Sequence, residues 1–283
     1  MKQIIAATFL CLLILFPQLC VEGAKQGLIL WGLTLVPTLL PFFIATRYIL
    51  QWNIHPRLLF PYLLFIGYFC GYPTGASVID QLFSVNTFTK KQAELLVCLC
   101  NHTSPAFLIS FVYYTYFTRH LSLISFLFPI YFSAILWSII FCFFFHRPPF
   151  FFSDSCMKKS TIPSKNLESI FIDSVYTIVK IGCFMVIFSI LINCSLSFFG
   201  SVSPLCSISS CFLEITSGLH FLSSFPISFH TKKALMEALC SFGGCCSIAQ
   251  VQGILHKELS TIPFILFKIC TGMTTFLLCY LAG

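Results

Sequence analysis

The stretches TKKQAELLVCLCNHTSP (residues 89–105) and TKKALMEALCSFGGCCS (residues 231–247) decide how this chain folds. Each opens with Thr-Lys-Lys, continues with helix-forming residues to a Leu-Cys pair, and then changes to small, polar or helix-breaking residues. An interrupted apolar segment precedes each of them, GYFCGYPTGAS (residues 67–77) and LEITSGLHF (residues 213–221). Broken apolar segments at corresponding positions of two halves indicate a transporter-type site near the middle of a membrane.

The composition places the chain in a lipid bilayer. Apolar residues make up 58% of the 283 residues and charged residues only 9%, whereas a soluble domain carries about 25% charged residues. At about 20 residues a span, the length suffices for roughly seven to nine hydrophobic segments. We therefore expect an all-α polytopic membrane protein with two broken or re-entrant segments in an inverted repeat.

The sequence divides into four parts. Residues 1–26 predict an N-terminal transmembrane helix, with a cleaved signal peptide as the alternative. Residues 27–146 and 166–283 form two membrane halves, separated by a basic loop over residues 147–165. The expected segments are 27–50, 58–83 (interrupted), 92–117 (interrupted), 121–145, 166–198, 204–226 (interrupted), 232–256 (interrupted) and 261–282. Pro37 and Pro41 should kink or shorten the first of these.

Lysine and arginine predict the orientation. If both interrupted segments return to their own side, one face carries Arg47, Arg57, Lys90, Lys91, Arg147, Lys158, Lys159, Lys165 and Lys257. The other face carries Lys25, Arg119, Lys232 and Lys233. The richer face should be cytoplasmic, which makes 147–165 a cytoplasmic loop of a multi-pass cell-membrane protein.

Polar groups at the breaks are the candidate site. Unpaired backbone groups within hydrocarbon are tolerated only where protein or a wet cavity satisfies them. Glu214 lies deep in an apolar segment, and a carboxylate at such depth usually marks an ion or substrate path. The predicted substrate-binding residues are Gly71, Tyr72, Pro73, Gly75, Asn101, Ser104, Pro105, Glu214, Gly218, Ser241, Gly243, Gly244, Ser247 and Gln250. Hydrogen bonds that only join helices are the alternative for each of them.

Other charged residues are given simpler interpretations. We expect Asp80 and Glu94 to be solvated and Lys268 to reach the interface along its aliphatic stem. Lys180 could pair with Glu214.

Several function classes are disfavoured. The sequence has no GxSxG, HExxH, P-loop or GxGxxG motif, so we expect no enzyme; His102 with Ser104 is the only local candidate pair. The 16 cysteines are mostly scattered in apolar runs, and neither Cys98-x-Cys100 nor Cys245-Cys246 has a usual zinc spacing. We expect no metal, no cofactor and, without a clustered basic and aromatic surface, no nucleic-acid partner. Nothing indicates an oligomeric state.

Four motifs together carry a family resemblance: GYPTGA (71–76), LCNHTSPAFLI (99–109), LEITSG (213–218) and SFGGCCSIAQV (241–251). They resemble the motif series of the YlbJ-type sporulation integral membrane proteins, which belong with the nucleoside-recognition, or Gate, domain proteins. Two positions depart from it: Ser77 stands where the family often has lysine, and Cys245-Cys246 intervene before Ser247.

The resemblance implies a solute transporter-like protein acting in endospore formation, particularly of the cortex, in a Gram-positive spore-former. Its ligand would be a small polar solute or a nucleoside. The alternative is a non-transporting membrane scaffold for spore envelope assembly.

Overall fold

The computed structural model describes residues 2–52, 56–118, 121–144, 166–199 and 204–282, and every regular element in these ranges is a helix. The predicted basic loop 147–165 lies outside the described residues. The first half contains α1 (Lys2–Leu15), α2 (Pro17–Leu30), the π-helix η1 (Trp31–Leu35), α3 (Val36–Ile49), α4 (Pro56–Phe69), α5 (Thr74–Ser84), α6 (Lys90–Leu99), α7 (Pro105–Phe107), the π-helix η2 (Leu108–Phe117) and α8 (Leu123–Phe144). The second half contains α9 (Leu167–Phe199), α10 (Pro204–Cys211), α11 (Ile215–Ser224), α12 (Phe229–Phe242), α13 (Gly244–Ile254) and α14 (Ile262–Leu281).

Helices suited to a membrane recur along the chain. Five helices in the described part are long and apolar enough to cross a bilayer: Pro17–Ile49, Leu123–Phe144, Leu167–Phe198, Phe229–Ile254 and Ile262–Leu281. Two shorter apolar helices cover Leu58–Phe69 and Pro105–Phe117. Large apolar side chains such as Leu33, Ile124 and Phe143 are more than half exposed on the outside. In water such a surface would associate, whereas lipid tails cover it without cost. The chain is an all-α, multi-pass membrane protein.

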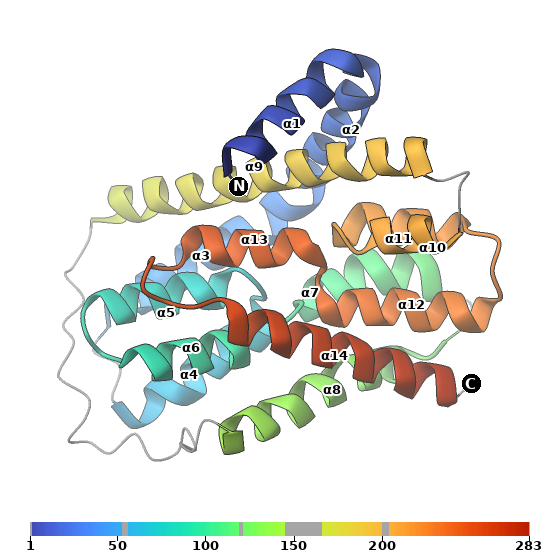
Figure 1. Cartoon of the computed structure of the whole chain (residues 1–283). Coiled ribbons are helices and arrows are strands. Elements are labelled where there is room, and N and C mark those ends of the chain that lie inside the picture. Colours follow the sequence, from blue (N-terminus) through green and yellow to red (C-terminus); the bar gives the residue numbers. More distant parts are fainter. Residues whose placement is uncertain (1, 53–55, 119–120, 145–165, 200–203, 283) are drawn as a thin grey trace.

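After α1, both halves show the same order of elements: a long helix, two broken helices and another long helix. The breaks cover residues 70–73, 100–104, 212–214 and 243, and we call them the first to fourth breaks. Glycine, proline or small polar residues occur at three of them, and at the third Glu214 begins a new helix. Figure 1 shows the broken helix α4–α5 towards one end of the bundle and α10–α11 towards the opposite end.

The first predicted segment after the N-terminal helix, residues 27–50, differs from the expectation. A continuous helix runs from Pro17 to Ile49, so it begins before residue 27 and neither Pro37 nor Pro41 ends it. The widened turn η1 lies just before Pro37. Proline has no N–H to donate, and its ring clashes with a carbonyl of the preceding turn. A widened turn makes room for the ring, so the helix continues past Pro37. The indole N–H of Trp31 donates to the oxygen of Ile178 at 2.9 Å, which joins this helix to α9.

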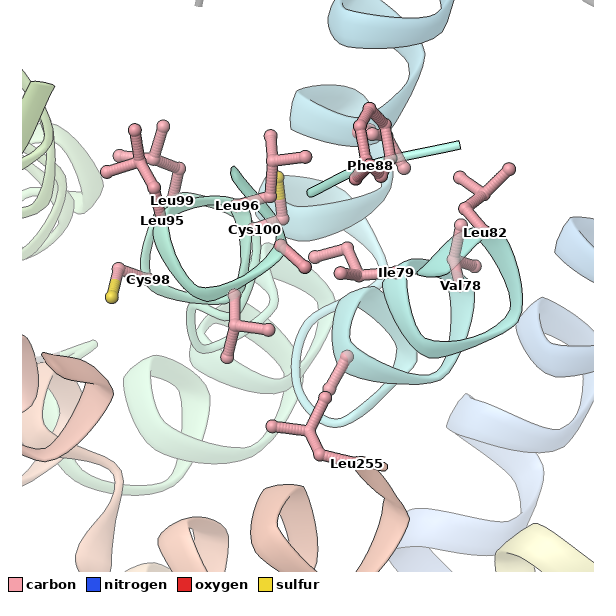
Figure 2. Packing of buried hydrophobic residues seen from close by; sticks show 14 of the residues in the cluster. Val78, Ile79, Leu82, Phe88, Leu95, Leu96, Cys98, Leu99, Cys100 and Leu255 are labelled. Atoms are coloured by element: carbon pink, nitrogen blue, oxygen red, sulfur yellow. The ribbon is translucent and has the colours of Figure 1, made fainter. Parts of the chain in front are cut away.

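The largest apolar core lies around the first broken helix. Side chains from α5 and α6 face one another and interdigitate, with Leu255 closing one side (Figure 2). Ile79 on α5 and Leu96 on α6 are each at most 1% exposed. This packing holds the half-helix α5 rigidly although it does not cross a membrane by itself.

Candidate functional site

The first and second breaks are joined by their backbones. The N–H of Tyr72 donates to the oxygen of His102 at 2.9 Å, and the N–H of His102 donates to the oxygen of Gly67 at 3.3 Å. Gly71 has φ +78°, a backbone conformation that favours glycine. Backbone groups at one break thus bond to backbone groups at or near the other. Within the hydrocarbon of a membrane such groups must find their hydrogen-bond partners in the protein.

Asn101 serves as a connector between these two breaks. Its Oδ1 accepts from the N–H of Ala76 at 2.8 Å, and its Nδ2 donates to the oxygen of Val97 at 2.8 Å. The side chain therefore caps the first turn of α5 and the last turn of α6. Gly75 allows this closeness, because a Cβ atom there would collide with the backbone oxygen of Cys100.

The third and fourth breaks repeat the arrangement. The N–H groups of Cys245 and Cys246 donate to the oxygens of Phe212 and Leu213 at 2.9 and 2.8 Å. Gly243 has φ +86° and ends α12, so the chain turns there at little steric cost. Again one broken helix supplies the hydrogen bonds that the other lacks.

Glu214 caps helix α11. Its Oε1 accepts from the N–H of Thr216 at 2.9 Å and from the Thr216 hydroxyl at 2.8 Å, and its Oε2 accepts from the N–H of Ser217 at 2.7 Å. The side chain is 2% exposed. Three donors and the positive end of the helix dipole stabilise the carboxylate at this depth.

The two halves meet at these breaks. The Tyr72 hydroxyl donates to the oxygen of Gly243 at 3.3 Å, and the Thr103 hydroxyl donates to the oxygen of Cys240 at 2.6 Å. The Tyr131 hydroxyl on α8 donates to the oxygen of Thr103 at 3.2 Å. Residues 137 and 171 positions apart in the sequence thereby form one polar centre.

A small cavity opens at this centre. It has a volume of about 40 Å³, room for a few waters and far below the roughly 300–1,000 Å³ of typical ligand pockets. Seven of the predicted residues line it: Gly71, Tyr72, Ser104, Glu214, Gly243, Ser247 and Gln250. Thr38 of α3 and Met185 of α9 also line the cavity, and sequence reasoning had included neither of them.

The other seven predicted residues lie beside the cavity. They do not line it: Pro73, Gly75, Asn101, Pro105, Gly218, Ser241 and Gly244. Several of them have structural contacts instead. A Cβ atom at Gly218 would collide with the backbone oxygen of Cys211, and Pro105 begins α7.

Three expectations about charged residues were wrong. Glu94 is only 9% exposed, and its Oε1 accepts from the N–H of Ser260 at 2.8 Å. Lys268 is fully buried instead of reaching an interface, and its Nζ donates to the oxygen of Ser241 at 3.3 Å. Lys180 donates to the oxygen of Gly253 and makes no hydrogen bond to Glu214, whose oxygens are occupied by α11. In each case the partner lies far away in the sequence, at 166 residues for Glu94, 27 for Lys268 and 73 for Lys180.

Asp80 is half-buried, and its Oδ1 accepts from the N–H of His256 at 2.6 Å. Sequence reasoning also missed Glu237, which is fully buried on α12. Its presence inside the TKK segment was the available signal, because a carboxylate within an apolar helix is costly.

His102 is enclosed by aromatic rings. Its ring lies 4.3 Å from Tyr68 and 5.7 Å from Phe267, between ring centroids, and its Nε2 is 3.0 Å from the oxygen of Leu99. It does not line the cavity. In the ranges that the structure covers, no group of three or more His, Cys, Asp or Glu side chains is placed to hold a metal ion.

The fold and the centre together define a class: a polytopic all-α membrane protein whose paired helix breaks meet around a polar cavity. Comparison with known proteins supports the assignment to the integral membrane proteins. The chain is 25% identical to the sporulation integral membrane protein YlbJ of Bacillus subtilis (strain 168) over an alignment of 334 positions, covering 95% of this chain and 80% of that protein. This homology supports the YlbJ-type family indicated by the motifs. No protein-family model matches the sequence, and no solved structure matches it.

Proposed function

We propose that this chain is a solute transporter-like protein of the cell membrane, with its substrate site where the four helix breaks meet, and that it acts in endospore formation. The observation that carries the proposal is the joining of breaks from both halves around one cavity, which polar and apolar side chains line together. Broken helices that meet near the midplane are how secondary transporters bind polar solutes.

The element order supports an inverted repeat. Each half has a long helix, two broken helices and a long helix, and the broken helices α4–α5 and α10–α11 lie towards opposite ends of the bundle (Figure 1). We infer that these two are re-entrant hairpins, one entering from each side, which with the long helices accounts for the expected seven to nine hydrophobic segments. Repeats of this kind allow alternating access by movement of one bundle against the other.

The substrate class follows from the lining. Hydroxyl, amide and carboxylate groups of Tyr72, Ser104, Gln250 and Glu214 suit a small polar solute such as a nucleoside. Because about 40 Å³ cannot hold such a molecule, the halves must separate at Tyr72 and Gly243 to admit it. The printed name of the relative, a sporulation membrane protein, supports the cellular role, and the family resemblance extends it to the spore cortex.

The test is a sporulation assay in the native host. Glu214→Gln keeps the size of the side chain but removes one acceptor and the charge at the cavity. Glu258→Gln makes the same change at an exposed position away from it and is the matched control. With equal membrane abundance, we expect loss of heat-resistant spores in Glu214→Gln only. Normal spores from that variant would overturn the proposal.

A transport assay would identify the substrate. Vesicles holding the wild type or Glu214→Gln would be offered radiolabelled nucleosides, and uptake by the wild type alone is the expected result. Uptake equal in both would place the substrate site elsewhere.

A further inference from the structure

A file of buried polar side chains runs from the centre along α14. Lys268, Thr271, Thr275 and Cys279 recur at intervals of three and four residues, which places them on one face of the helix. Each is at most 1% exposed. Threonines are common at helix interfaces in membranes, but a lysine on such a face is costly to bury and needs a reason.

Hydroxyl groups link this file to α8 and α12. The Ser133 hydroxyl on α8 lies 2.7 Å from the Thr275 hydroxyl and 3.2 Å from the Ser241 hydroxyl on α12. The Thr275 hydroxyl also donates to the oxygen of Thr271 at 2.9 Å. The hydroxyls of Ser133, Thr275 and Ser241 therefore form one hydrogen-bonded cluster that joins α8, α12 and α14.

Glu237 ends the file away from the centre. It lies one helical turn before Ser241, and its Oε2 accepts from the thiol of Cys279 at 2.7 Å. Among the residues that the structure describes, its Oε1 has no hydrogen-bond partner, although the side chain is fully buried. A buried charged oxygen without a hydrogen bond costs several kcal/mol, so Oε1 is an acceptor that lacks the partner its burial calls for. The titratable groups that interact with it are Lys233 and Cys240 on α12 and Cys279 on α14.

Lys268 ends the file beside Tyr72, which lines the cavity. Its Nζ donates to the oxygen of Ser241 and lies 5.4 Å from the centre of the Tyr72 ring and 5.8 Å from that of Phe264. Cys98 and His102 on the α6 side are the titratable groups that interact with it. Because Tyr72 also lines the cavity, one aromatic ring separates Lys268 from the proposed substrate site.

We propose that Glu237 binds and releases the proton that drives transport, and that the polar file from Glu237 to Lys268 connects this proton to the substrate site. This rests on the proposed function. A proton from hydronium bonds to Oε1 of the Glu237 carboxylate, which becomes the neutral acid while the hydronium becomes water. On release the O–H bond breaks and the proton passes to a water molecule, which becomes hydronium.

A proton suits this site better than a metal cation. Hard cations take about six oxygen ligands in a regular shell, whereas Glu237 has one thiol partner and no oxygen partner among the described residues. A proton needs only one free oxygen.

The test is infrared spectroscopy of the full-length protein in lipid during a pH titration. Wild type should show a carboxyl C=O band that disappears on deprotonation, and Glu237→Gln should lose that band. Glu94→Gln is the matched control, since Glu94 is also buried but accepts from the N–H of Ser260, and it should keep the band. Cys279→Ala removes the hydrogen bond to Oε2 and should shift the band to higher frequency.

Two outcomes would overturn the proposal. One is a titrating band that persists in Glu237→Gln, and the other is a band that responds to sodium at constant pH. If Glu237→Gln fails to fold, the band shift in Cys279→Ala still decides, because an unshifted band would not belong to Glu237. These spectra require no substrate, so they fail independently of the spore assay on Glu214.

Discussion

The hydroxyl of Tyr72 donates a hydrogen bond of 3.3 Å to the backbone oxygen of Gly243. Tyr72 belongs to the first break and Gly243 to the fourth, so this bond crosses from one half of the protein to the other. The Lys268 ammonium lies over the same tyrosine ring, 5.4 Å from its centre. One side chain therefore touches the cavity, the opposite half and the polar file on α14.

Gly75→Ala should destabilise the protein strongly. A Cβ atom at Gly75 meets the backbone oxygen of Cys100, which cannot move without disturbing the second break. We expect a loss of about 1–3 kcal/mol or more, as in overpacked cores. The melting temperature would measure this loss of stability. It is obtained by heating the protein in detergent and recording by size-exclusion chromatography how much stays folded. Gly32→Ala is the control, because a Cβ there has no neighbour within 4 Å; equal melting temperatures for both variants would contradict the described contact.

Asn101→Ala should act through stability and not through substrate binding. It removes the partner of the Ala76 N–H and of the Val97 oxygen, both at 2.8 Å. A buried polar group left unsatisfied costs about 1–3 kcal/mol, so a clear fall in melting temperature is expected. Gln252→Ala, which removes an amide at an exposed position of α13, should melt like wild type. A variant Asn101→Ala with normal stability and weakened uptake would return Asn101 to the substrate site.

Lys268→Met should fold and yet fail in function. The two side chains have similar length, and burying an isolated charge is unfavourable, so its replacement by an apolar group should not lower stability. We expect an unchanged or higher melting temperature together with loss of heat-resistant spores. Lys257→Met, at an exposed position, provides the matched control. Normal sporulation in Lys268→Met would show that the ammonium only fills space.

The two hairpins should be reached from opposite sides of the membrane. Asn86 follows α5 and Ser224 ends α11, and both are exposed. Single Asn86→Cys and Ser224→Cys substitutions should each gain one site for a membrane-impermeant maleimide above the wild-type level. In intact cells only Ser224→Cys should gain label, because the lysine and arginine bias places the Asn86 side in the cytoplasm. Labelling of both in intact cells would reject the inverted arrangement.

Local sequence signals determined the long helices and their interruptions. The expected segment 166–198 is α9, Leu167–Phe199, and 121–145 is α8, Leu123–Phe144. Each apolar run satisfies its own backbone as a helix wherever it lies in lipid. Gly71, Gly243 and the capping carboxylate Glu214 act on their immediate neighbours, so the positions of the breaks were also predictable.

The partners of the polar groups could not be predicted from local signals. Whether Glu94, Lys268 and Glu237 are solvated depends on which helix covers them, and that is decided by packing between residues 27 to 166 positions apart in the sequence. Asn101 shows the same limit, because its type suited a ligand contact as well as a helix cap. The sequence by itself determined a membrane protein of long and broken helices, since hydrocarbon and backbone hydrogen bonding act locally. Only the tertiary structure decided which polar groups face the cavity and which are consumed in holding the breaks together, because a buried donor or acceptor is satisfied by whatever the fold brings within about 3 Å of it.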